Sequence, residues 1–77
     1  MNGHLTPEQL QLLFKLRKVS NKTLYGKAIS DAAYSCYDQA GFKKIVTELK
    51  EASTDGPKVM EDILGSELVN EIKVLEV

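Results

Sequence analysis

The sequence predicts an all-α protein, a compact bundle of four to five short helices that forms a single domain over residues 1–77. Apolar residues recur at intervals of three and four through most of the chain, which is the spacing of one helix face. Residues that begin helices precede these stretches, most clearly Thr6-Pro7, and glycines separate them at Gly41, Gly56 and Gly65. Seventy-seven residues suffice for one domain and no more.

The first helix is predicted over residues 7–18. Thr6 is a good N-cap because its hydroxyl can accept from a free amide of the first turn, and Gln9 completes a capping box with it. Pro7 suits the first helical position, where its missing N–H costs nothing. Apolar residues cover a wide arc of this helix, so we expect it to be central to the core.

A second helical segment is predicted from the cap-type residues Ser20 and Asn21 to about Gln39. One kinked helix is favoured, and the alternative is two short helices with Ser30-Asp31 as a second cap. Gly41 is expected to end the segment, because glycine adopts left-handed dihedrals at little cost.

The third helix is predicted over residues 42–52, where Phe42, Ile45, Val46 and Leu49 share one face. The composition of residues 53–57 predicts a loop. Residues 58–77 form a last amphipathic segment that is expected to break near Gly65-Ser66, with Ser66 capping the second part. Residues 71–77 contain more β-branched side chains and also fit a short terminal strand.

The residues that catalysis and metal binding require are sparse, so we expect a protein that is not an enzyme and needs no cofactor. His4 is the single histidine and Cys36 the single cysteine, which argues against a zinc site and excludes an intrachain disulfide. A lone thiol is typical of a reducing compartment, and the chain shows neither a secretion signal nor a transmembrane run. These observations predict a cytoplasmic protein without membrane contact.

Charge is distributed unevenly along the chain. Residues 1–44 carry seven basic and three acidic side chains, whereas residues 45–77 carry three basic and eight acidic ones. The basic half predicts a second function class, a transcriptional regulator that binds nucleic acid, with Lys43 and Lys44 following a helix-turn-helix turn at 39–41. Its candidate contact residues are Lys15, Arg17, Lys18, Lys22, Lys27, Lys43 and Lys44. A pI near 5.7 is low for a dedicated DNA-binding domain.

The favoured prediction is a small regulatory protein that acts through protein–protein interaction, as an inhibitor, adaptor or antirepressor of bacterial or phage type. A domain of this size has a marginal core, which makes a homo-oligomer an expected support. Tyrosine offers apolar area together with a hydroxyl and is enriched at interfaces. The amphipathic C-terminal segment either closes the bundle or mediates self-association, and in the second case it is a further candidate surface. The candidate interface residues are Tyr25, Tyr34, Tyr37, Leu68, Ile72 and Leu75.

Overall fold

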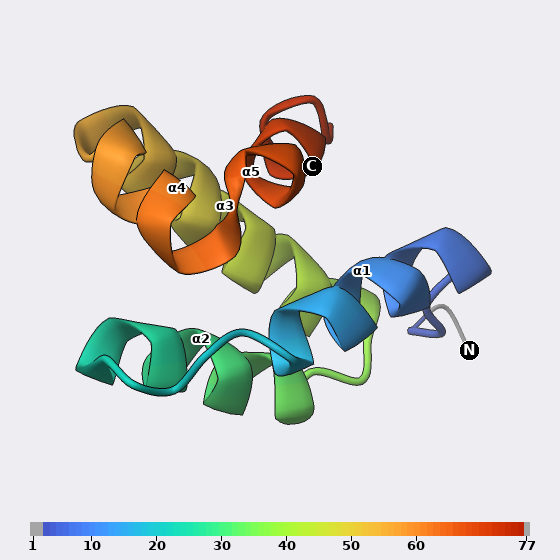
Figure 1. Cartoon of the computed structure of the whole chain (residues 1–77). Helices are drawn as coiled ribbons and strands as arrows, with labels where there is room; N and C mark the ends of the chain where they lie inside the picture. Colours follow the sequence, from blue (N-terminus) through green and yellow to red (C-terminus); the bar gives the residue numbers. More distant parts are fainter. Residues whose placement is uncertain (1–2, 77) are drawn as a thin grey trace.

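The computed structural model describes residues 3–76 and is all-helical over that range, as predicted. Figure 1 shows α1 and α2 on one side of the longest helix, α3, with α4 and α5 on the other. The helices are α1 (Pro7–Arg17), α2 (Leu24–Tyr34), α3 (Gln39–Asp55), α4 (Pro57–Leu64) and α5 (Ser66–Lys73). The molecule measures 38 × 23 × 17 Å along its principal axes, so it is flat and elongated.

Helix α1 begins as the sequence predicts. The Thr6 hydroxyl accepts from the Gln9 amide at 3.2 Å, while the Gln9 side chain accepts from the Thr6 amide at 2.8 Å. This reciprocal pair is the predicted capping box. The segment before α1 lies along the start of α3, where the Gln39 amide donates to the Gly3 carbonyl at 3.0 Å.

The prediction of one helix up to Gln39 was wrong. Helix α2 begins after Thr23, whose hydroxyl accepts from the Gly26 amide at 2.9 Å, and it ends at Tyr34. Gly41 is not a stop, because it lies in the first turn of α3 and donates its amide to the Asp38 carboxylate at 2.8 Å. Asp38 is thus the N-cap that begins the next helix early. The helix-turn-helix turn expected at 39–41 is therefore helical.

Two further boundaries differ from the prediction. Helix α3 continues to Asp55 instead of ending at Ala52, and the break comes at Gly56-Pro57. Thr54 is tolerated in the last turn because its hydroxyl donates back to the Lys50 carbonyl at 3.0 Å. The expected division near residue 65 is present, but the chain turns at Gly65, with φ 89°, and Ser66 is helical and does not cap.

The predicted C-terminal strand is absent from the described residues, which contain no strand. Helix α5 continues to Lys73, and the Lys50 amine on α3 donates to the Leu75 carbonyl beyond it. Val77 lies outside the described residues. The core receives side chains from all five helices, which are Leu12, Leu13, Leu16, Ile29, Ala33, Phe42, Ile45, Val46, Leu49, Met60, Leu68, Val69 and Ile72, together with Cys36 from the connection after α2.

Candidate functional site

Large apolar side chains are exposed mainly in the first half of the molecule. Six of the eight such residues in the described chain belong to α1, α2 or the connection after α2: Leu10, Phe14, Leu24, Tyr25, Tyr34 and Tyr37. The other two, Val59 and Val74, belong to the second half. Single exposed apolar residues are ordinary, so it is the clustering and its geometry that mark a candidate site.

Arg17 joins two of these aromatic residues into one unit. Its guanidinium carbon lies 5.3 Å from the ring centre of Phe14 and 5.3 Å from that of Tyr34. Its Nε donates to the Ala33 carbonyl at 3.1 Å, which fixes the guanidinium over the seam between α1 and α2. Phe14 remains 50% exposed and Tyr34 64% exposed, so both rings still face solvent while they hold the arginine.

The local sequence explains why this seam is closed. Phe14 and Arg17 are three residues apart and neighbour each other on α1. Tyr34 ends α2, and α2 is held against α1 by the Ser30 hydroxyl, which donates to the Arg17 carbonyl at 3.0 Å. In the first turn of α2, Gly26 lies so close to the carbonyl of Ser20, in the connection between the two helices, that a Cβ there would be only 2.2 Å away. Gly26 thus fits the start of α2 against this connection, and Ser30 fixes α2 to the end of α1.

We define the α1–α2 face by the residues around this unit, which are Leu10, Phe14, Arg17, Lys18, Lys27 and Tyr34. Leu10, Phe14 and Lys18 follow one another at intervals of four along α1 and its C-cap. Lys27 and Tyr34 are seven residues apart and share one side of α2. The face therefore combines apolar ridges with positive charge.

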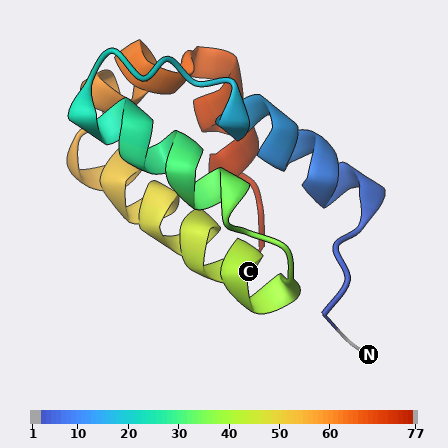
Figure 2. The same ribbon diagram turned by 90° about the horizontal axis from the view of Figure 1, so that it is seen from below.

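The three predicted tyrosines do not form a single site. Tyr34 lies at the seam with α1, whereas Tyr25 lines a narrow cleft between α2 and α3 together with Ala28, Ala32 and Glu48. Figure 2 shows these two helices running beside each other in opposite directions. Tyr37 lies in the connection after α2 and is 77% exposed. Only Tyr34 has a defined charged partner among the described residues.

The three C-terminal candidates lie against the protein's own core. Leu68 and Ile72 are buried, and Leu75 is partly buried against the same cluster. In this arrangement their apolar area is covered by the monomer itself. The sequence pattern could not decide this, because an amphipathic helix looks the same whether it packs on its own chain or on another.

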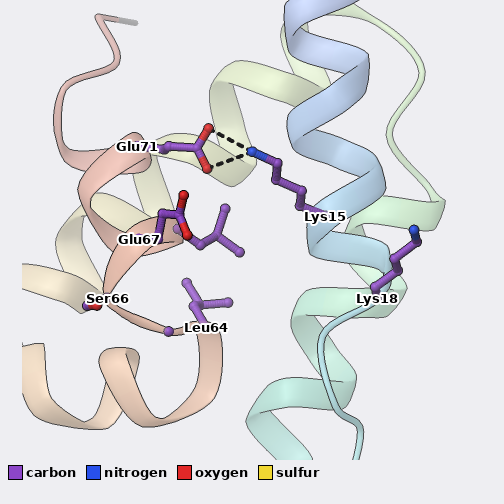
Figure 3. A pocket seen from close by; sticks show the side chains of 8 residues that line it. Lys15, Lys18, Leu64, Ser66, Glu67 and Glu71 are labelled. Carbon is purple, nitrogen blue, oxygen red and sulfur yellow. Dashed lines mark hydrogen bonds and ion pairs between the residues drawn. The ribbon is translucent and has the colours of Figure 1, made fainter.

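The seven basic candidates are divided among different surroundings. Figure 3 shows the Lys15 amine reaching across to Glu71, and it lies 3.0 Å from both carboxylate oxygens. The Lys18 amine points away from α5 in the same view. Lys44 lines a separate cleft between α2 and α3 with Cys36 and Glu48, and Lys43 precedes it as an exposed residue. Lys22 is exposed in the connection before α2, and Lys27 is exposed on α2.

The pocket in Figure 3 is open and has mixed charge. It lies between α1 and the corner where α4 meets α5, and its volume is about 580 Å³. Lys15 and Lys18 line one side, while Glu67 and Glu71 line the other. Because the carboxylates offset the lysines, this lining defines no single ligand charge.

Cys36 is buried and its thiol is held in the neutral form. Burial raises the pKa of this thiol, with the Asp38 carboxylate adding to the rise, although the hydrogen bond to the Asp38 backbone and the positive charge of Arg17 lower it. A reactive cysteine needs the opposite environment, one that stabilises the thiolate. The structure thus places Cys36 as a small apolar packing residue.

No group of three or more histidine, cysteine or acidic side chains in residues 3–76 is placed to hold a metal ion. In the same range, no helix combines the length and apolar character needed to span a bilayer. Comparisons with models of protein families, with curated proteins and with solved structures found no match.

The sequence could have indicated one part of the site that was missed. The spacing of Phe14 and Arg17 makes them neighbours on α1, so their contact was predictable from the sequence. The contact between Arg17 and Tyr34 was not predictable, because it depends on how α2 folds back on α1. Arg17 was predicted as a nucleic-acid contact, whereas in the structure its guanidinium lies over the rings of Phe14 and Tyr34.

Proposed function

We propose that this protein is a small non-enzymatic regulatory protein that binds another protein through the α1–α2 face. The observation that carries the proposal is the Phe14–Arg17–Tyr34 group, whose two rings stay exposed although Arg17 connects them at the seam of two helices. Arginine and tyrosine are enriched among the residues that contribute most to protein interfaces. A side chain already held in place loses less entropy on binding than a free one.

The distribution of apolar surface supports the same proposal. The second half of the molecule buries most of its large apolar side chains, including Leu68 and Ile72, in the shared core, and Val59 and Val74 are its exposed ones. The first half leaves Leu10, Phe14 and Tyr34 partly uncovered. Such uncovered area costs solubility unless a partner uses it.

The test is a capture experiment with matched variants. Phe14→Ala combined with Tyr34→Ala removes both rings, and Val59→Ala combined with Val74→Ala trims exposed apolar residues of the other half. We expect the first variant to weaken the purified, reconstituted complex by about tenfold or more, and the second to leave it nearly unchanged. Equal losses in both variants, or none in the first, would contradict the proposal. Circular dichroism checks that each variant is folded.

Nucleic-acid binding is the alternative, and Lys18, Lys22 and Lys27, exposed on the first half, favour it. Binding to mixed-sequence duplex DNA is measured across a salt series, with light scattering giving the mass of the free protein. Micromolar binding that weakens steeply with salt would support a nucleic-acid regulator. The expected result is weak or absent binding, because Lys15 is paired with Glu71 and Lys44 lies in a different cleft.

A further inference from the structure

The guanidinium of Arg17 is held in place, but not all of its hydrogen-bond donors are used. Its Nε donates to the Ala33 carbonyl, and its central carbon lies 5.3 Å from the ring centres of both Phe14 and Tyr34. Within residues 3–76 no hydrogen bond or ion pair involves its terminal Nη groups. An arginine presents two parallel donors on that edge, a geometry that matches a carboxylate.

The surroundings of Arg17 favour a negatively charged ligand. Lys18 lies one turn beyond Phe14, at the end of α1, and Lys27 lies on the same side of α2 as Tyr34. Asp31, the one acidic residue of α2, shares the side of Lys27 and Tyr34, and α1 carries Glu8 alone, in its first turn. The face is therefore net positive, although the whole chain has a net charge of −1.

The same face also requires an apolar contact. Leu10 and Phe14 lie on one ridge of α1, one turn apart, and both are exposed. A ligand that carried charge alone would leave this ridge in water. An apolar side chain beside a carboxylate would cover the ridge and pair with Arg17 at the same time.

We infer that the α1–α2 face binds an acidic segment of a partner protein, with a carboxylate on the Nη edge of Arg17 and an apolar side chain on the Leu10–Phe14 ridge. This inference rests on the proposed function and specifies the chemistry of the partner. A phosphate backbone would also pair with Arg17, but it offers nothing to the apolar ridge. A second copy of this chain could supply acidic residues from its own second half, and the test below separates that outcome.

The experiment is a titration of the isotope-labelled full chain with synthetic peptides, followed through its backbone amide signals. The probe is a short peptide in which glutamates flank a central leucine, and the controls carry glutamine or lysine in place of glutamate. We expect the acidic peptide alone to shift the amides around Phe14, Arg17 and Tyr34. An absence of shifts up to millimolar peptide, or equal shifts with the glutamine peptide, would overturn the inference.

Variants identify the role of the stacked arginine. Arg17→Lys keeps the charge but loses the flat fork, so we expect it to weaken binding of the acidic peptide by about tenfold. Tyr34→Phe keeps the ring and should retain binding, whereas Tyr34→Ala should lose it. Lys58→Ala removes a positive charge from exposed α4 and serves as the remote control. Unchanged affinity in Arg17→Lys would overturn the inference.

Two results would show that the α1–α2 face binds a ligand other than an acidic segment of a partner protein. If duplex DNA shifts the same amides at lower concentration than the acidic peptide, the ligand is nucleic acid. If the free protein forms salt-sensitive oligomers that Arg17→Lys dissolves, the occupant is a second copy. Either result overturns the inference. If the acidic peptide does not bind but the Phe14→Ala and Tyr34→Ala double variant still loses the captured partner, the inference is overturned and the proposed function is retained.

Discussion

Helices α1 and α2 (the α1–α2 pair) and helices α3, α4 and α5 (the α3–α5 unit) differ in how far they bury their apolar residues. The α3–α5 unit turns most of its large apolar side chains inward, with Met60, Val69 and Ile72 almost completely buried. The α1–α2 pair contributes Leu13, Leu16 and Ile29 to the same core but leaves aromatic rings outside it. Charge differs in the same direction, since residues 1–38 carry five basic and three acidic side chains, whereas residues 39–77 carry five basic and eight acidic ones.

Under the proposed function, this difference separates a region that binds a partner from a region that stabilises the fold. A domain of this size has little apolar surface to spare, because it buries only about 60% of what its unfolded chain exposes. Exposing Phe14 and Tyr34 therefore forgoes stabilisation that the fold could have used. We therefore propose that recognition depends on the α1–α2 pair and stability mainly on helices α3 to α5.

The largest expected effect is the loss of the α1–α2 seam in Gly26→Ala. A Cβ at this position would meet the Ser20 carbonyl at 2.2 Å, and backbone atoms cannot move aside as a flexible side chain can. We expect the free energy of unfolding to fall by about 3 kcal/mol, measured by denaturant titration. Gly56→Ala is the control, because its nearest neighbours are 3.8 Å away. A smaller loss in Gly26→Ala than in the control would show that the seam adjusts easily.

The next effect concerns the corner between α4 and α5. Gly65 has φ 89° and ψ 149°, a conformation that side-chain-bearing residues rarely adopt. We expect Gly65→Ala to reduce the unfolding free energy by about 2 kcal/mol through backbone strain alone, since no atom lies within 4 Å of the added Cβ. Ser66→Ala should change it by less than about 0.5 kcal/mol. Equal effects would mean that the corner relaxes without strain.

Ser53 offers a gain of stability within the α3–α5 unit. Its hydroxyl is buried on α3 and has no hydrogen-bond partner among the described residues. Removing an unsatisfied hydroxyl should raise the unfolding free energy by about 1 kcal/mol in Ser53→Ala. Thr47→Ala, at an exposed position of the same helix, measures the contribution of helix propensity alone. A destabilised Ser53→Ala variant would reveal a partner for the hydroxyl.

A smaller effect is expected for the ion pair that connects the two regions. Lys15 and Glu71 lie 3.0 Å apart, but their side chains are 53% and 43% exposed. Water and salt screen such a pair, so a double-mutant cycle with Lys15→Ala and Glu71→Ala should give a coupling of about 0.5 kcal/mol or less. The coupling should disappear at high salt. A much larger value would make this contact a principal connection between the two regions.

The smallest effect is a pH dependence that arises from Cys36. Because burial raises the pKa of its thiol, the folded state keeps the proton at a pH where the unfolded state has lost it. The associated stability is complete below the pKa of the unfolded thiol and declines as pH rises past about 9. The unfolding free energies of the wild type and of Cys36→Ala, measured by denaturant titration over this range, should therefore converge with rising pH. Parallel curves would contradict the assignment.

The sequence was sufficient for the helical class and for α1, because its capping box and apolar spacing are local signals. It failed where two local signals compete. Gly41 resembles a helix stop, but Asp38, three residues earlier, caps a helix that includes it. The extension to Asp55 was missed because serine, threonine and aspartate suggest a loop, although Thr54 can bond back to its own helix.

The candidate site was only partly predictable for a different reason. Exposure of a tyrosine or leucine depends on which neighbour covers it, and that neighbour is distant in the sequence. Tyr34 was selected for its chemistry, but its contact with Arg17 requires the α1–α2 packing. Leu68 and Ile72 were selected as a free apolar face, yet the bundle covers them. Periodicity identifies an apolar face and does not identify its partner.

The most direct test of the account is the hydrogen-exchange footprint of the captured partner on this protein. Amide exchange is compared between the free protein and the complex for every helix. The account predicts added protection in α1, α2 and their connection, centred on Phe14, Arg17 and Tyr34, with little change in α4 and α5. Added protection confined to α4 and α5, with none at the stacked arginine, would contradict the division between a recognition pair and a stabilising unit.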